Sequence, residues 1–180
     1  MTQKLVEDGK AAALRHAFDR SFALPPPQAA QQIEDLLAIR VAGDPYAIRL
    51  RDIAGVVAGR RVVPVPAVTL DLLGLAGIRG RVVPVFGLAS LLGYGQAGGS
   101  PRWMVLCGPE EPIALAFSDF EGYLRLPTSA LHADDSLRGT RQHVSEVAST
   151  EAGARSVISI PLVVATLRNR VEHPQPVKEQ

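Results

Sequence analysis

From about residue 36 onward, apolar and polar side chains alternate over short stretches, a pattern typical of β-strands with one buried face. Apolar side chains recur at every second position over residues 37–41 and again over residues 46–50, with Gly43-Asp44-Pro45 between them. Turn-forming residues between two alternating segments predict a β-hairpin with one buried face. Further short, apolar segments are predicted as strands: 53–58, 62–65, 102–108, 113–117, 120–126, 144–148 and 157–160. Many short strands separated by turns predict a mainly β domain of the barrel type.

The stretch of residues 72–93, LLGLAGIRGRVVPVFGLASLLG, is the centre of this pattern. Within it, Gly77-Ile78-Arg79-Gly80-Arg81 places arginine beside glycines, and glycine permits a tight bend at positive φ. The β-branched segment Val82–Val85 predicts a strand, and the segment 88–93 predicts one or two helical turns that end at a glycine. We therefore expect a strand, a glycine turn that presents Arg79, a second strand and a short helix.

Proline and glycine indicate how the other segments end. Because Pro64 and Pro66 border it, the segment 62–65 suits the edge of a sheet. The last predicted strand continues into a terminal helix with Pro161 in its first turn. We expect a helical turn over residues 68–73, a loop over 93–101, a long polar loop over 127–142 and a polar tail from residue 173.

Residues 3–23 predict an amphipathic helix, because Leu14, Phe18 and Phe22 fall on one of its faces. Pro25-Pro26-Pro27 ends this helix and begins a stiff connector. The helix either packs on its own domain or docks a partner through the face of these three side chains. We expect an N-terminal segment of residues 1–27, a main domain of residues 28–170 and a C-terminal tail of residues 171–180.

Composition narrows the class of protein. The chain has 180 residues, of which 47% are hydrophobic and 21% are charged, so it can bury a core. Its net charge of +1 implies no general attraction to nucleic acid or to an anionic membrane. The N-terminus lacks the charge pattern of a signal peptide, and no run of about 18 apolar residues would span a membrane. We therefore expect a soluble, cytoplasmic protein that does not insert into the membrane.

No motif in the chain combines into a catalytic site. Residues 93–98 match G-x-G-x-x-G, but a short helix precedes them and a strand follows, the reverse of the dinucleotide-binding order. His132 and the nearby Asp134-Asp135-Ser136 fall in one polar loop, where a nucleophile and its base would lack fixed geometry. The single cysteine, Cys107, lies in an apolar strand and is interpreted as a core residue. We expect no metal, no cofactor and no enzymatic activity.

The pair Arg60-Arg61 could contact phosphate groups, but neither an aromatic platform nor a wider basic stretch accompanies it in the sequence. A nucleic-acid-binding SH3- or OB-like domain is therefore an alternative of low rank. A module that binds a small molecule between the predicted barrels is the other alternative, although no set of titratable residues supports it.

The central stretch resembles the CheW family of bacterial chemotaxis coupling proteins. The resemblance is carried by Gly77-Ile78-Arg79-Gly80, by Val82-Val83-Pro84-Val85 and by Gly87-Leu88. It extends to the first hairpin and the later strands, and covers about residues 36–168. It implies a mainly β fold of two intertwined SH3-like five-stranded β-barrels, with short helices, an added N-terminal helix and a hydrophobic seam between the barrels.

The resemblance also implies a function. Proteins of this family are adaptors, not enzymes, and join the cytoplasmic hairpin of a chemoreceptor to the regulatory domain of a CheA-type histidine kinase in chemotaxis or related motility pathways. By family position, Arg79 would lie at the rim of the receptor groove, above a floor of Ile53, Val56 and Val57. The alternatives are that Arg79 is a solvated turn residue paired with an internal acid, and that Ile53 and Val57 are ordinary core residues.

Three glycines depart from the family pattern. Gly77 replaces an asparagine before the turn, Gly87 replaces an aspartate after Pro-Val, and Gly55 replaces an acid found in many members. That acid can pair with the turn arginine. The resemblance therefore implies a divergent member in which Arg79 lacks its usual partner.

Overall fold

The computed structural model describes residues 32–66, 69, 71–95, 101–108, 111–133 and 143–172. From Ile33 onward these residues belong to one compact unit. The predicted N-terminal helix with Leu14, Phe18 and Phe22, the proline connector and the tail from residue 173 lie outside the described residues. No helix in the described ranges is long and apolar enough to cross a membrane.

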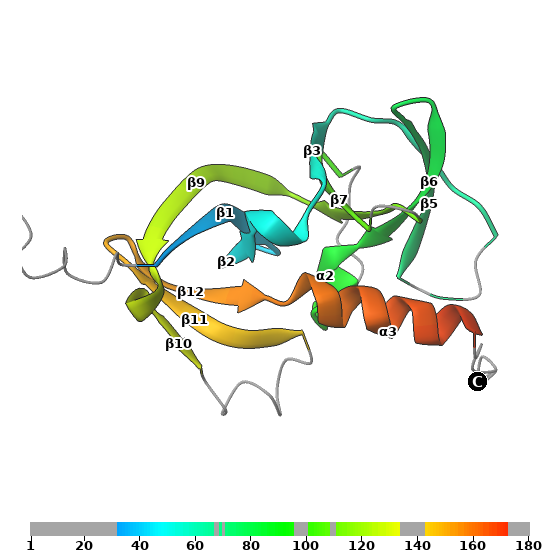
Figure 1. Cartoon of the computed structure of the whole chain (residues 1–180). Coiled ribbons are helices and arrows are strands. Elements are labelled where there is room, and N and C mark those ends of the chain that lie inside the picture. Colours follow the sequence, from blue (N-terminus) through cyan, green and yellow to red (C-terminus); the bar gives the residue numbers. More distant parts are fainter. Residues whose placement is uncertain are drawn as a thin grey trace, which may run out of the picture. The chain divides into compact units, whose positions relative to one another are not determined.

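The described chain forms two β-sheets (Figure 1). Sheet A contains, in spatial order, β10 (Leu131–Ala133), β11 (Val144–Thr150), β12 (Gly153–Ile158), β2 (Asp44–Arg49), β1 (Ile33–Val41) and β9 (Asp119–Pro127). Sheet B contains β3 (Gly55–Ala58), β7 (Trp103–Cys107), β8 (Ile113–Phe117), β6 (Arg81–Gly87), β5 (Leu72–Ile78) and β4 (Val62–Val63). Neighbouring strands are antiparallel except for the pairs β12–β2 and β6–β8.

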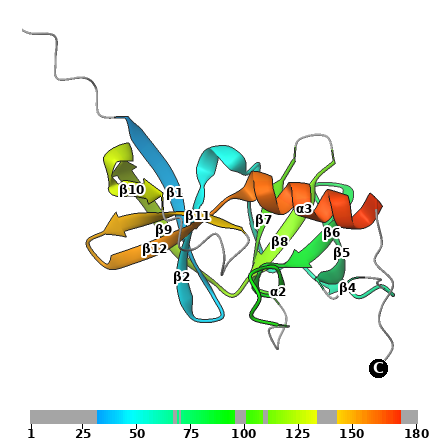
Figure 2. The same ribbon diagram turned by 90° about the horizontal axis from the view of Figure 1, so that it is seen from below.

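The two sheets are intertwined in the chain, as the resemblance implied. All of sheet B comes from the segment between β2 and β9, so sheet A is built from strands on both sides of it. Each sheet has six strands instead of the expected five; the shortest are β4, within the predicted strand segment 62–65, and β10, within the expected loop. The helical elements in the described ranges are η1 (Leu50–Asp52), α2 (Leu88–Leu91), η2 (Thr128–Ala130) and α3 (Ile160–Glu172). Helix α3 leaves the end of β12 and lies along sheet B (Figure 2).

Three apolar clusters fill the unit. The seam cluster lies between the sheets and includes Leu37, Ile39, Tyr46, Ile48, Val105, Cys107, Leu115, Ile160, Val163 and Leu167. The sheet-B cluster consists of Ala76, Ile78, Val83, Val85, Met104, Leu106, Ala114 and Ala116, and the sheet-A cluster of Leu36, Ala47, Ala148 and Val157. Successive side chains of a strand point to opposite faces, so Leu36 and Leu37 enter different clusters. The expectation that the first hairpin has one buried face is therefore wrong, because both faces of β1 are covered.

Two hairpin tips have the same backbone geometry. Ala42 and Gly43 join β1 to β2 with φ values of 52° and 90°, and Arg79 and Gly80 join β5 to β6 with 51° and 76°. Two consecutive positive φ values define the two-residue turn that matches strand twist. The tip of the central hairpin is confirmed. The first turn is shifted from its predicted position, since Asp44 already belongs to β2.

Other expected segments differ from the structure where a partner strand supplies backbone hydrogen bonds. The expected helical turn at 68–73 is wrong in its last two residues, which begin β5; Leu72 pairs with Phe86 of β6, and Leu73 lies at a register shift. The expected loop at 127–142 contains η2 and β10, and His132 pairs with Val147 of β11. The terminal helix with Pro161 in its first turn is confirmed, as is the edge position of β4.

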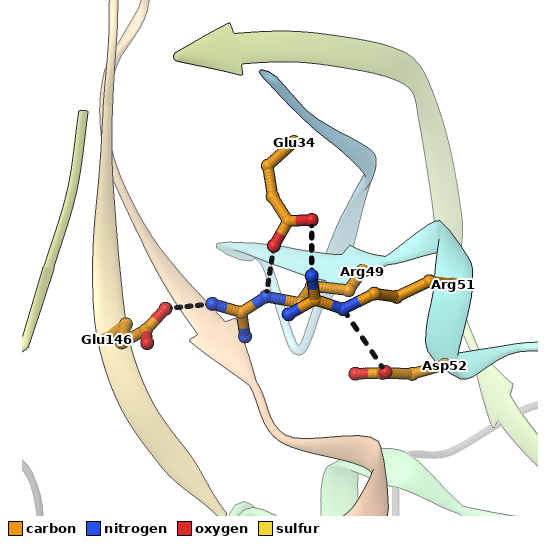
Figure 3. A network of polar contacts seen from close by, with 5 residues as sticks. All are labelled: Glu34, Arg49, Arg51, Asp52 and Glu146. Carbon is orange, nitrogen blue, oxygen red and sulfur yellow. Dashed lines mark hydrogen bonds and ion pairs between the residues drawn. The ribbon is translucent and has the colours of Figure 1, made fainter. Parts of the chain in front are cut away.

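A network of charged side chains ties sheet A to η1 (Figure 3). The Nε of Arg49 donates to Glu34 at 2.8 Å, and its Nη2 donates to Glu146 of β11. Arg51 donates to the other oxygen of Glu34 at 2.8 Å and lies 3.9 Å from Asp52. Burial lowers the pKa of Arg49, but the two glutamates more than offset this, so its pKa stands above the usual value. The network links three strands and η1 at the point where the chain passes from sheet A to sheet B.

Candidate partner-binding surface

Arg79 occupies the tip of the β5–β6 hairpin and is exposed. Its guanidinium extends to β3, where Nη2 lies 3.1 Å from the position that a Cβ on Gly55 would take. Strands β7 and β8 stand between β3 and β6 in the order of sheet B. The sheet therefore curls until its hairpin tip meets its first strand, which is how a barrel-type fold brings distant segments together.

Gly55 lies beside the guanidinium of Arg79 and has no side chain that could pair with it. Its φ of 153° is one that residues with a side chain rarely adopt, which favours glycine at this point of β3. Within the described ranges, Arg79 makes no ion pair and no side-chain hydrogen bond. The structure thus leaves the guanidinium beside β3 with its donors open to a partner.

The other two departures from the family pattern have different surroundings. A side chain at Gly77 would meet open space. Gly87 precedes α2, and a Cβ there would lie 3.2 Å from the Ser90 hydroxyl, which donates to the Gly87 carbonyl at 2.9 Å. The Gly87 amide donates to the carbonyl of Asp71 at 2.8 Å. Backbone groups and Ser90 therefore hold the start of α2 without a capping side chain at position 87.

The predicted groove residues Ile53, Val56 and Val57 are all half-buried. Ile53 and Val56 pack against the seam cluster, whereas Val57 packs against the sheet-B cluster. Val56 and Val57 are consecutive in β3 and so point to opposite faces. The structure therefore places Ile53 and Val56 against the same cluster and Val57 against a different one.

A groove lies beside η1, which precedes Ile53, and was not predicted from the sequence; none of the three predicted residues lines it. Its volume is about 510 Å³, and it is bounded by η1, the end of β7 and α3; its lining is Asp52, Gly108, Ile160, Pro161, Val164, Ala165, Arg168 and Asn169. A second groove of about 660 Å³ follows the other side of α3 and is lined mainly by Val82, Pro84, Phe86, Ile113, Val164 and Leu167. A sequence signal for these grooves was present in α3. Val163 and Leu167 are four residues apart, as on one face of a helix, and both are buried, so Val164 and Arg168 lie at the flank of that buried face.

Among the residues that superficially suggest catalysis, the structure describes His132 and Cys107. His132 is exposed on β10, and the Asp134-Asp135-Ser136 run lies outside the described residues. Cys107 is fully buried in the seam, and burial, together with the nearby charge of Asp52, raises the pKa of its thiol to about 12. The described residues contain no group of three His, Cys, Asp or Glu side chains that could hold a metal ion.

His143 is the one histidine buried in the described part of the chain, with 1% of its surface exposed. Neither ring nitrogen has a hydrogen-bond partner there. Burial and the nearby positive charge of Arg170 lower the pKa of His143, and Asp71 opposes them. Arg170 of α3 is itself ion-paired with Asp71, so this polar cluster attaches the end of α3 to the start of β5.

Comparisons with known proteins agree with this architecture. Residues 35–170 match a family model described as CheW-like domain. The crystal structure of the scaffolding protein TtCheW from Thermoanaerobacter tengcongensis matches with a TM-score of 0.63 and 16% identity, covering 71% of this chain and 89% of that chain. At this identity the likeness shows a shared fold. A comparison with curated proteins found no match.

Proposed function

The chain belongs to the CheW-like domain family, and from this premise we propose that it is a non-catalytic signalling adaptor. It couples the cytoplasmic hairpin of a chemoreceptor to the regulatory domain of a CheA-type histidine kinase, in the cytoplasm and at receptor arrays. The pathway is chemotaxis or a related motility or regulatory system. Support comes from the match over residues 35–170 and from the fold shared with a protein described as scaffolding.

The observation that carries the receptor part of this proposal is the state of Arg79. The side chain is exposed and held against Gly55, and it has no acidic partner among the described residues. A guanidinium presents several donors in a planar fork, which matches a carboxylate. Arg79 therefore offers a binding point for an acidic side chain of the receptor, next to the apolar strand that carries Val56.

The groove between η1 and α3 supports a helical partner. Its walls combine apolar surface from Ile160 and Val164 with polar groups at Asp52 and Arg168. An amphipathic helix lays its apolar face into a groove of this kind and leaves its charged residues at the edges. In this proposal, Ile53 and Val56 support the η1 side of the groove by packing against the seam cluster, while Val57 supports the barrel of sheet B.

Co-purification of the full chain with a chemoreceptor and a CheA-type kinase of the same organism tests the proposal. We expect Arg79→Ala to reduce capture of the receptor and to change the free energy of unfolding by less than about 1 kcal/mol, because the side chain is exposed. Arg125→Ala is the matched control, since Arg125 is 74% exposed and lies in sheet A, 3.2 Å from Asp35. Undiminished receptor capture by folded Arg79→Ala protein would refute the role of Arg79. Absence of both receptor and kinase from the wild-type complex would refute the adaptor function.

A further inference from the structure

The segment that forms sheet B contains more arginines than acidic residues. Between Gly55 and Phe117 the chain has five arginines, no lysine and three acidic residues. Of these acids, Asp71 is already paired with Arg170 of α3. The sequence places the arginines at three separate positions, 60–61, 79–81 and 102, which gives no continuous basic stretch.

The fold brings these three positions to one rim. The amide of Gly59 donates to the carbonyl of Arg102 at 3.0 Å, which fixes the start of the loop carrying Arg60 and Arg61. This loop ends at Val62, which pairs with Ala76, two residues before the base of the central hairpin. We define the arginine rim as Arg60, Arg61 and Arg102, which neighbour Arg79; all three are exposed.

The arginine rim differs from sheet A in how its charges are satisfied. In sheet A and η1, each described arginine is paired with a carboxylate; these are Arg40, Arg49, Arg51, Arg125 and Arg155. The three rim arginines make no ion pair and no side-chain hydrogen bond with the described part of the chain. Repulsion among neighbouring like charges is unfavourable, so a surface of this kind is stabilised when an anionic partner covers it.

We infer that the arginine rim is a docking surface for an acidic segment of a partner protein, in addition to the groove of the proposed function. The surroundings favour a protein over a nucleic acid. Val63 and Val82, on strands next to the rim, are 53% and 73% exposed, so the surface offers apolar contacts beside the cations. Trp103, which follows Arg102, is half-buried and packs against Phe120 and the seam cluster, so its ring is engaged within the protein and not presented as a stacking platform.

Fluorescence anisotropy with defined probes tests this inference on the full chain. The main probe is a labelled peptide rich in glutamate with interspersed leucines, and its counterpart has glutamine in place of every glutamate. A single-stranded oligonucleotide and vesicles containing phosphatidylglycerol serve as the other anionic probes. We expect the glutamate peptide to bind most tightly, the glutamine peptide to lose this binding, and the affinity to fall as salt rises from about 0.05 M to about 0.3 M.

Charge reversal assigns the binding to the rim. Arg60→Glu/Arg61→Glu is expected to weaken binding of the glutamate peptide about tenfold, because two favourable pairs become repulsive. Arg102→Glu gives a second, independent variant should the first not fold. Arg125→Glu, at an exposed site of sheet A, is the matched control and is expected to leave binding within about twofold.

Three results would overturn the inference: no binding of the glutamate peptide, equal binding by the rim variants, or tighter binding of the oligonucleotide or the vesicles. None of these variants alters Arg79, so receptor capture in the co-purification remains a separate result. Loss of peptide binding with intact receptor capture supports the arginine rim as a second surface. Loss of receptor capture by Arg79→Ala, with peptide binding unaffected by the rim variants, supports the proposed function alone.

Discussion

Replacement of Arg49 by methionine is expected to destabilise the protein more than any other single change in the network of Figure 3. Arg49 is 11% exposed and lies between Glu34, which is 14% exposed, and Glu146, which is 30% exposed. Methionine keeps much of the side-chain length and removes the charge and all hydrogen-bond donors. The two carboxylates then remain in a poorly solvated position with one cation fewer.

The magnitude follows from what each glutamate retains. Glu34 keeps its 2.8 Å ion pair with Arg51, whereas Glu146 loses its bond to Arg49. Breaking a fully buried pair costs about 3–5 kcal/mol, and partial exposure reduces this, so we expect Arg49→Met to cost about 2 kcal/mol. Arg51→Met is the control; because Arg51 is 66% exposed, its loss should cost less than about 1 kcal/mol.

Urea unfolding followed by the fluorescence of Trp103 measures both changes. Trp103 is the only tryptophan in the sequence and packs against Phe120 and the seam cluster, so its emission reports separation of the sheets. A variant with Arg49→Met, Glu34→Gln and Glu146→Gln removes the uncompensated charges together and is expected to recover about 1 kcal/mol. If Arg49→Met costs no more than Arg51→Met, or if the triple variant is the least stable, the reasoning from burial is refuted.

Three further predictions concern the seam and its border. The pKa of His143 is lower in the folded chain than in the unfolded one, so its contribution to stability is complete above about pH 6.5 and is lost as the pH falls further. His143→Gln should therefore flatten the pH dependence of the urea midpoint, whereas His132→Gln, at an exposed site, should leave that dependence unchanged. Leu115→Ala removes a fully buried seam side chain and should lower the free energy of unfolding by about 3 kcal/mol, whereas Leu162→Ala, 49% exposed on α3, should cost less than about 1 kcal/mol. Cys107, with a pKa of about 12, should resist a thiol reagent at about pH 8 in the native state and react at the rate of unfolding; rapid native labelling would contradict its burial.

The local pattern of the sequence determined most strands of this protein, its central turn and its family. Alternation of apolar residues located the first hairpin and most strands, because a strand with a buried face repeats every two residues. Glycine beside Arg79 located the tip of the central hairpin, because the turn needs positive φ. The family followed from the same residues, and the comparisons confirm it. The N-terminal helix and its docking face stay predictions.

Only the tertiary structure decided which of these elements meet. A period of two places Val56 and Val57 on opposite faces, but does not say that both faces of β1 and β3 have neighbours; that depends on two sheets packing around a shared seam. The sequence around His132 predicts a loop, whereas in the structure His132 belongs to β10, which pairs with β11. Arg79 reaches Gly55, and Arg60-Arg61 comes beside Arg79 and Arg102, because sheet B curls and pairs strands that lie far apart in the chain. Long-range pairing depends on the sum of many contacts, so a short stretch of sequence could predict the arginines but not their assembly into one rim.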